Sequence, residues 1–310
     1  PALRYVRRLR GLLQKASRQV IHTNGLKMHV LGAWARPRAS AVLWHLHDYA
    51  GRRPLAARLL TRSAHHWSAI VANSSSVADD VRRVCGDVIP IYPVWNAVDL
   101  TRFSPDGTRA DLDALAGLAP IEGALRIGLV ATFARWKGHT TFLEALAMLP
   151  PSLSMRAYVI GGPVYETSGS QVSIEELRAL VSALGLESRV AFTGFVQDTA
   201  SAMRALDIVV HASTDPEPFG LVIAEAMACG KPVVASRAGG AVELTDPGVN
   251  SLAHAPGDAR ALARCIGDLA SNPRLRERLG QAALITARQR YTRTRMAQQL
   301  TGIYESLRPA

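Results

Sequence analysis

Residues 215–236 read DPEPFGLVIAEAMACGKPVVAS, a stretch that combines a turn, a helix start and a buried strand. After an apolar run, Glu217 and Pro218 fall in a loop, and a helix opens at Phe219 and Gly220. The first N–H groups of a helix have no partner within it and lie at the positive end of its dipole. We therefore predict an anion site here, at the carboxyl end of a parallel strand, where open α/β sheets bind ligands.

Two carboxylates flank the predicted anion site. Glu217 precedes the helix, and Glu225 lies about one and a half turns into it. Because Gly220 has no Cβ, a phosphate can approach the backbone there. Carboxylates on both sides of an anion pocket suit a ligand made of a sugar, a diphosphate and a ribose.

Outward from this stretch, short apolar runs alternate with helical patterns along the chain, which predicts βα units and parallel sheets. The predicted strands of a first series are 20–22, 41–45, 70–72 and 88–91, with helices at 26–35, 54–64 and 76–85 between them. A second series is predicted at 126–131, 156–160, 190–193, 208–211 and 232–235, and from Asp258 the sequence is almost entirely helical. Residues 3–19 are expected to form a basic amphipathic helix with an apolar stripe of Leu3, Val6, Leu9, Leu13 and Ala16.

These two series predict two Rossmann-like, doubly wound α/β domains. We expect the first at 1–105, the second at 106–285, and a terminal helix at 286–310. The first series supplies about four strands where a full half of this type has about six, so the N-terminal domain is expected to be incomplete. Because the chain begins with Pro1 and not Met, we expect the true start to lie upstream.

The charge of +11 is concentrated in the first third of the chain. Residues 1–99 hold 15 Lys and Arg against five Asp and Glu, and no acidic residue precedes Asp48. This pattern fits either a solvated basic face or a surface that meets an anion, such as a lipid headgroup or a phosphorylated acceptor. Nucleic acid is not an expected partner, because no recognition motif accompanies the charge.

The stretch EPFGLVIAEAMACGKPVVAS, with seven residues between its two glutamates, resembles the donor-site signature of glycosyltransferase family four. The resemblance implies a GT-B fold, in which two Rossmann-like domains face a cleft, here without the family's opening strands. It also implies a retaining, metal-independent transfer of a sugar from a UDP- or GDP-linked donor, with no cofactor. In that reading Glu217 orients the transferred sugar, Glu225 holds the ribose, and the helix start at Pro218, Phe219, Gly220 and Leu221 binds the diphosphate.

Other segments resemble the same family in the same order. In ATFARWKGH, Arg135 and Lys137 match the basic pair that neutralises the diphosphate, although the family usually has a longer spacer between the two. Gly162 in VIGGP matches a glycine turn, and Val196 in FTGFVQD matches the loop bordering the nucleobase. WNAVDLTRFSP resembles the family's interdomain element, and the terminal helix is expected to cross back onto the N-terminal domain.

In WHLHD, His47 matches the strand end where the family often places an active-site histidine, with His45 as the rival residue facing the core.

The sequence does not identify the acceptor. The basic N-terminal half favours an anionic or lipid-linked acceptor, and we expect a role in cell-envelope glycan or glycolipid synthesis. A catalytically weak nucleotide-sugar-binding or scaffold protein is the alternative. A dinucleotide oxidoreductase is excluded, because neither series opens with GxGxxG.

The expected location is the cytoplasm, with a peripheral contact on the inner face of an anionic membrane. Three widely spaced cysteines predict a reducing compartment and no metal cluster. No apolar run in the sequence is long enough to span a bilayer.

Overall fold

The computed structural model describes residues 2–16, 19–164 and 169–307, in two compact units. The first unit comprises Pro1–Ala97 and Arg293–Ala310, and the second comprises Val98–Thr292. The domain boundaries expected from the sequence, after residues 105 and 285, lie eight residues later and seven residues earlier than these.

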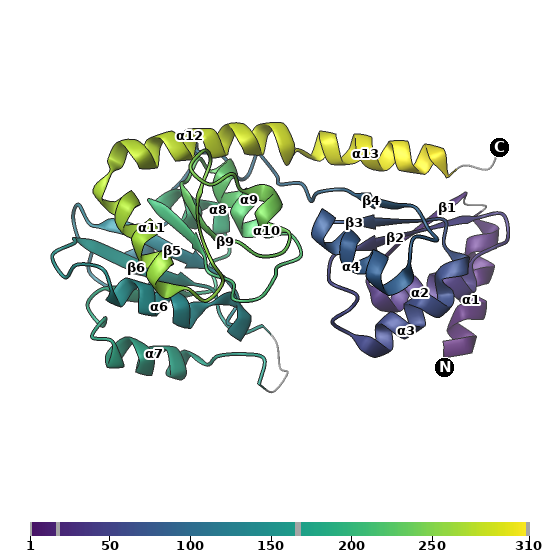
Figure 1. Ribbon diagram of the computed structural model, residues 1–310, viewed down its shortest axis with the longest axis horizontal. Helices are drawn as coiled ribbons and strands as arrows, with labels where there is room; N and C mark the ends of the chain where they lie inside the picture. The colour runs from purple at the N-terminus through teal and green to yellow at the C-terminus, as the bar shows by residue number, and fades with distance from the viewer. Residues whose placement is uncertain (1, 17–18, 165–168, 308–310) are drawn as a thin grey trace. The chain divides into compact units, whose positions relative to one another are not determined.

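The first unit is built on a four-stranded parallel sheet in the order β1-β2-β3-β4 (Figure 1). Its strands are β1 (Val20–Asn24), β2 (Ala41–Leu46), β3 (Ala69–Ala72) and β4 (Ile91–Pro93). They are joined by α2 (Leu26–Ala35), α3 (Pro54–Ser63), the short helix η1 (Ala64–His66) and α4 (Ser75–Cys85). The strand predicted at 88–91 is placed too early in the sequence. Pairing with β3 starts at Ile91, and Val88 is 74% exposed.

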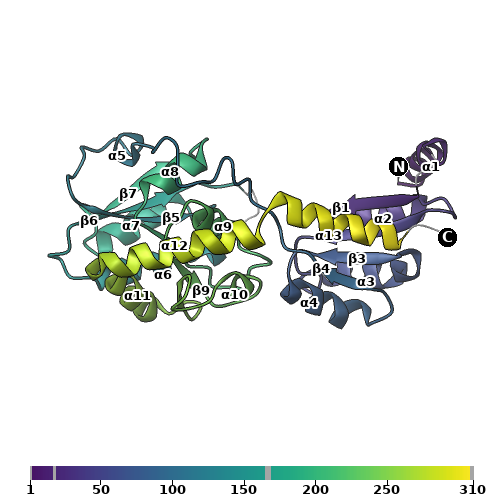
Figure 2. The same cartoon turned by 90° about the horizontal axis from the view of Figure 1, so that it is seen from above.

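Alternate side chains of this sheet pack on opposite faces, as the period of two along a strand requires. Val42 and Trp44 belong to the core under α2, α3 and α4. Leu43 and Val71 point the other way and pack with Ile303 of α13 (Arg293–Ser306). Figure 2 shows α13 lying along this second face of the sheet. The C-terminal helix therefore completes the N-terminal unit.

Helix α1 (Ala2–Lys15) packs on α2, and part of its predicted apolar stripe is correct. Val6 is buried and Leu9 and Leu13 are half-buried, whereas Leu3 is 73% exposed and Ala16 is exposed. Leu3 lies about 60° around the helix from Val6, so it falls outside the buried sector. Residues 17–18 of the predicted helix lie outside the described residues.

The second unit contains a six-stranded parallel sheet in the order β10-β9-β8-β5-β6-β7. Its strands are β5 (Leu125–Val130), β6 (Met155–Ile160), β7 (Val190–Gly194), β8 (Ile208–His211), β9 (Val233–Ser236) and β10 (Leu252–His254). The first five confirm the predicted strands, and β10 was not predicted from the sequence.

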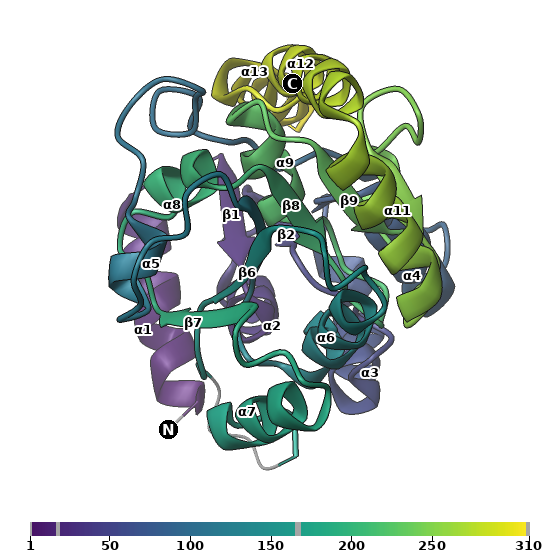
Figure 3. The same cartoon turned by 90° about the vertical axis from the view of Figure 1, so that its left-hand side faces the viewer.

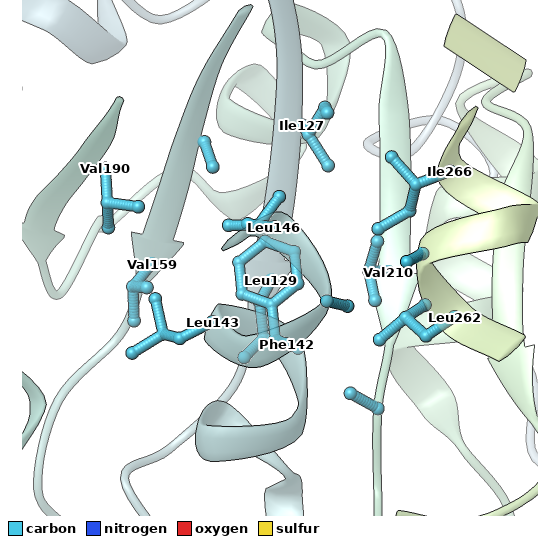
Figure 4. Packing of buried hydrophobic residues seen from close by; sticks show 14 of the residues in the cluster. Ile127, Leu129, Phe142, Leu143, Leu146, Val159, Val190, Val210, Leu262 and Ile266 are labelled. Carbon is cyan, nitrogen blue, oxygen red and sulfur yellow. The ribbon is translucent and has the colours of Figure 1, made fainter. Parts of the chain in front are cut away.

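Helices cover both faces of the second sheet (Figure 3). The helices are α5 (Leu112–Leu115), η2 (Arg135–Lys137), α6 (His139–Ala147), α7 (Ile174–Ala183), α8 (Thr199–Ala205), α9 (Leu221–Ala228), α10 (Ala241–Leu244), α11 (Ala259–Ser271) and α12 (Pro273–Arg290). Residues of α6, α7 and α11 bury their apolar side chains against one face, with Phe142, Leu146 and Ile266 among them (Figure 4).

Successive connections from β5 step outward to β6 and β7, whereas those from β8 step to β9 and β10 on the other side. The strand order therefore reverses between β5 and β8. A crevice for ligands forms at such a switch point, outside the carboxyl ends of the strands. Among the described residues, no helix has the length and apolar character needed to cross a membrane.

Candidate functional site

The loops that follow β5 and β8 touch each other at the switch point. The backbone N–H of Thr214 donates to the carbonyl of Trp136 at 2.8 Å. Gly138 has a φ of +75°, and a Cβ built on it would lie 1.8 Å from the carbonyl oxygen of Ala212. Only glycine suits both the left-handed backbone and this close approach. The contact fixes η2 beside the loop that carries Glu217.

Helix α9 begins at Leu221, directly after the loop that was predicted to hold an anion. Gly220 precedes it with a φ of +93°. The loop is tied down from the far side, because the N–H of Gly240 donates to the Glu217 carbonyl at 2.7 Å. The Phe219 side chain is buried and packs edge-on against Tyr291. It therefore anchors the helix start, leaving contacts with a ligand to the backbone of this turn and to the half-exposed Leu221.

Glu217 and Lys137 form an ion pair at the centre of the site. The Lys137 ammonium lies 2.6 Å from Oε1 of Glu217, and both side chains are largely buried. The ammonium also lies 4.1 Å from the ring centroid of Trp136, a cation–π contact. Two residues 80 positions apart, each predicted separately to contact the donor, are thus brought together.

The second oxygen of Glu217 is held by His211 and Ser213, which the sequence reasoning did not assign to the site. Oε2 lies 2.5 Å from Nε2 of His211 and 2.9 Å from Oγ of Ser213. The Nδ1 atom of His211 accepts from the N–H of Ser236 at 3.4 Å, so the ring proton is on Nε2 and is donated to the carboxylate. The position of His211 at the last residue of a buried strand was the available signal.

This environment keeps Glu217 ionised. Burial alone raises the pKa of its carboxyl, but the hydrogen bond from His211 and the charge of Lys137 outweigh burial and hold that pKa far below its usual value. The carboxylate is consequently a weak base, and it is suited to accept hydrogen bonds from hydroxyl groups.

Arg135, the other predicted diphosphate ligand, is exposed and pairs with a residue outside the central cluster. Its guanidinium lies 2.9 Å from Oε1 of Glu176. Glu176 also completes a capping box with Ser173 at the start of α7. Arg135 and Lys137 therefore have different partners in this structure, although they lie in the same turn of helix.

Glu225 is half-buried on α9, and no described residue gives its carboxylate a hydrogen bond or an ion pair. Burial raises the pKa of Glu225 to about 7, and the charge of Arg102 opposes this only in part. A half-buried carboxylate without a hydrogen-bond partner is stabilised when a ligand supplies hydroxyl donors.

The remaining predicted donor-site residues lie at the ends of β6 and β7. Gly162 follows β6, and a Cβ on it would lie 2.7 Å from the ring of Phe195. Val196 is half-buried in the loop between β7 and α8. Both follow the carboxyl ends of strands in the sheet that contains β8, the strand before Glu217.

In the first unit, His47 follows β2 and is exposed, with Nε2 3.0 Å from Oδ1 of Asn24. His45 is buried within β2, and its Nε2 has no partner among the described atoms. Burial lowers the pKa of His45 to about 3, so its ring is neutral. Both histidines border a cavity of about 250 Å³ that also contacts Gly25, Asp48 and Tyr49.

Two family descriptions match this chain. "Glycosyl transferases group 1" matches residues 117–285, which is more than half of the chain and contains the Lys137–Glu217 pair. The chain belongs to this glycosyltransferase family. "Glycosyltransferase Family 4" matches residues 1–102, so the predicted resemblance to family four is confirmed.

Individual relatives of this glycosyltransferase agree. The lipopolysaccharide core biosynthesis mannosyltransferase LpcC of Rhizobium leguminosarum bv. viciae is 32% identical over 219 residues, 71% of this chain and 60% of that protein. A D-inositol 3-phosphate glycosyltransferase of Corynebacterium urealyticum is 32% identical over 244 residues, 77% of this chain and 56% of that protein. The chain thus spans somewhat more than half the length of these relatives.

Among solved structures, Alr3699/HepE of Anabaena in complex with UDP superimposes with a TM-score of 0.86 at 30% identity. The match covers 96% of this chain and 82% of that one. The same protein has also been crystallised with UDP-glucose. Together with the two parallel sheets, this likeness confirms the predicted GT-B fold.

Proposed function

We propose that this glycosyltransferase transfers a sugar, with retention of configuration, from a nucleotide-diphosphate donor to an acceptor hydroxyl in cell-envelope glycan or glycolipid synthesis. One observation carries the proposal. The Lys137–Glu217 pair lies at the carboxyl end of β8, one loop away from the start of α9 and the unpartnered Glu225. Glu217, the cation with the helix N-terminus, and Glu225 suit in turn the sugar, the diphosphate and the ribose of such a donor.

Each group has a role in the proposed reaction. Negative charge on the departing diphosphate is stabilised by Lys137 and by the N–H groups at the start of α9. Arg135, which pairs with Glu176 of α7, also contributes. Glu217 accepts hydrogen bonds from the sugar, and Glu225 accepts them from the ribose. Because Glu217 is a weak base, we assign deprotonation of the acceptor to the leaving diphosphate. His47 contacts the sugar or the acceptor. No cofactor or metal ion takes part in the proposed mechanism.

The relatives support a donor type and a pathway class. HepE was crystallised with UDP and with UDP-glucose, which favours a uridine donor for this chain, with a guanosine donor as the other candidate. LpcC acts in lipopolysaccharide core biosynthesis by its name, which supports an envelope acceptor.

The donor site is tested by thermal unfolding and calorimetry with UDP, GDP and ADP. We expect one nucleotide to stabilise the protein selectively, by about 3 kcal/mol when its concentration is 100 times Kd. Glu225→Ala is expected to weaken that binding at least tenfold. A tenfold change in Kd corresponds to about 1.4 kcal/mol, and one hydrogen bond to a charged group contributes at least about that much. Glu144→Ala, which removes a half-buried glutamate on α6, is the control and should bind as the parent protein does.

Absence of a response to all three nucleotides in folded protein would contradict the proposal. Selective nucleotide binding without hydrolysis or transfer of the corresponding sugar would favour the alternative, a nucleotide-sugar-binding or scaffold protein. Transfer that inverts the anomeric configuration would remove the retaining mechanism while keeping the donor site.

We further propose that the protein acts in the cytoplasm, with the first unit on the inner face of an anionic membrane. On α1, exposed Arg4, Arg8 and Lys15 lie on the side opposite to the buried Val6, and exposed Arg7 lies at the edge of this side. Exposed Tyr5 and Leu12 flank this basic face. Basic helices with apolar residues at the border of the charged face bind anionic lipid surfaces.

Arg7→Gln combined with Arg8→Gln is expected to weaken binding to phosphatidylserine vesicles about 30-fold at low salt, since each surface cation contributes about 1 kcal/mol. Binding by the parent protein should fall steeply as salt is added. Arg260→Gln with Arg264→Gln, two exposed arginines on α11, is the matched control for net charge. Equal losses in both double variants, or binding that ignores salt, would contradict a specific contact through α1.

A further inference from the structure

We propose that His211 and Ser213 are positioning residues that bind Oε2 of Glu217 and so present Oε1 to the sugar. The inference rests on the proposed function, because it assigns a task to two residues beside the donor sugar. Neither residue belongs to the expected donor-binding set. Both are buried, with exposures of 3% for His211 and 1% for Ser213, so they act on the substrate through Glu217.

The division of labour between the two carboxylate oxygens follows from the contacts. Oε2 receives one hydrogen bond from the His211 ring and one from the Ser213 hydroxyl. The Ser213 hydroxyl also lies 3.1 Å from Nε2 of His211, so the three side chains form a closed triangle. Oε1 contacts Lys137, the cation we expect at the donor diphosphate. A sugar hydroxyl beside Lys137 therefore meets Oε1.

The triangle is held in place by residues of the sheet as well as by the loop after β8. His211 is the last residue of β8, and its Nδ1 is held by the backbone N–H of Ser236 in the neighbouring β9. From β10, Nε2 of His254 lies 3.3 Å from the carbonyl oxygen of His211. Strand-mounted groups hold a functional side chain in place more accurately than loop residues do. The imidazole thus has one orientation, with Nε2–H directed at Glu217.

Near pH 7, the charge states of the other titratable groups around the triangle leave this arrangement intact. Lys137 approaches from η2 as the cation. His139, the first residue of α6, is buried, and burial and the charge of Lys137 lower its pKa to about 4. Burial also lowers the pKa of His254. Both imidazoles are neutral near pH 7, so Lys137 and the two hydrogen-bond donors define the charge on Glu217.

The test compares His211→Leu, which removes the hydrogen bonds of the ring, with His211→Gln, which keeps an N–H donor at a similar reach. Ser213→Ala removes the second donor, and Ser63→Ala, a buried serine bonded to a backbone carbonyl in α3, is its control. The readouts are kcat and KM for donor hydrolysis from pH 4.5 to 8, UDP affinity, and the ¹³C chemical shift of the Glu217 carboxyl, assigned with Glu217→Gln.

For His211→Leu we expect kcat to fall at least tenfold at an unchanged UDP affinity, since UDP lacks the sugar. The acidic limb of the profile should move to higher pH, because the lost hydrogen bond stabilised the ionised carboxyl. The Glu217 signal should titrate between pH 4 and 7 in His211→Leu and remain ionised in the parent protein. His211→Gln should restore most of the rate, and Ser213→Ala should show a smaller change of the same sign.

An unshifted acidic limb and an ionised Glu217 in His211→Leu would overturn the proposal, because Lys137 alone would then suffice. A parallel loss of rate and UDP affinity would also overturn it by showing a general structural role. If the parent protein turns over no nucleotide sugar, the proposed function fails. The carboxyl titration then still decides whether His211 controls Glu217.

Discussion

Lys137→Met is expected to reduce sugar transfer on the order of 10³-fold, the largest effect of a single substitution in the donor site. Removal of one group that stabilises transition-state charge costs about 10²–10³ in kcat. Lys137 also holds Oε1 of Glu217, so the substitution disturbs the orientation of a second functional group. The measurement is kcat/KM for transfer or for donor hydrolysis.

The same substitution should lower the free energy of unfolding. Breaking a buried ion pair from one side costs about 3–5 kcal/mol, and the remaining bonds from His211 and Ser213 place Lys137→Met at or below the lower end of this range. Adding Glu217→Gln removes the unpaired charge. The double variant should therefore regain part of the lost stability while remaining inactive.

The contribution of ionised Glu217 to the stability of the fold depends on pH. The pKa of Glu217 is lowered in the folded protein, so its ionisation stabilises the fold above the unfolded-state pKa near 4.5, and that contribution is lost as the pH falls further. The stability difference between the parent protein and Glu217→Gln should therefore be full above about pH 5 and shrink below it. A Lys137→Met variant with parental activity would contradict the proposed charge stabilisation.

Gly138→Ala is expected to prevent the second unit from reaching its native structure, or to destabilise it by more than about 4 kcal/mol. The new methyl group would lie 1.8 Å from the Ala212 carbonyl oxygen, and the φ of +75° would be strained as well. Both atoms of the clash belong to backbone or to Cβ, so no side-chain rotation relieves it. Urea denaturation followed by circular dichroism measures the effect.

Gly185→Ala separates the two causes. Gly185 has a φ of +66°, but a Cβ there meets nothing within 4 Å. This control carries only the backbone penalty of about 1–2 kcal/mol. Equal stabilities of the two variants would show that the loops after β5 and β8 move apart easily, which would contradict a rigid switch-point contact.

Much of the fold could be predicted because the strands of both units are short, continuous apolar runs with helical patterns between them. Strand β10 escaped prediction, since three residues carry too little pattern and are ordered mainly by pairing with β9. The start of β4 was misplaced because Val88 and Ile89 look like strand residues, although pairing with β3 begins only after Pro90.

Site residues could be predicted one at a time but not as pairs. The placement of Glu217 and Glu225 on one site could be predicted because they lie close together in the sequence, before and within one helix. The contact of Glu217 with Lys137 spans 80 positions, and that of Arg135 with Glu176 spans 41. Such pairs depend on how β5, β6 and β8 align in the sheet, which sequence pattern alone does not reveal.

Helix α13 has a consequence for how the protein is made. It is synthesised after the whole second unit, yet Ile303, Leu300 and Met296 cover a face of the sheet that is synthesised before that unit. During translation, Leu43 and Val71 therefore lack their packing partners on α13 until the second unit has been synthesised. The first unit is therefore completed only after α13 has left the ribosome, so a chain cut short before α13 would expose an apolar sheet face to chaperones and proteases.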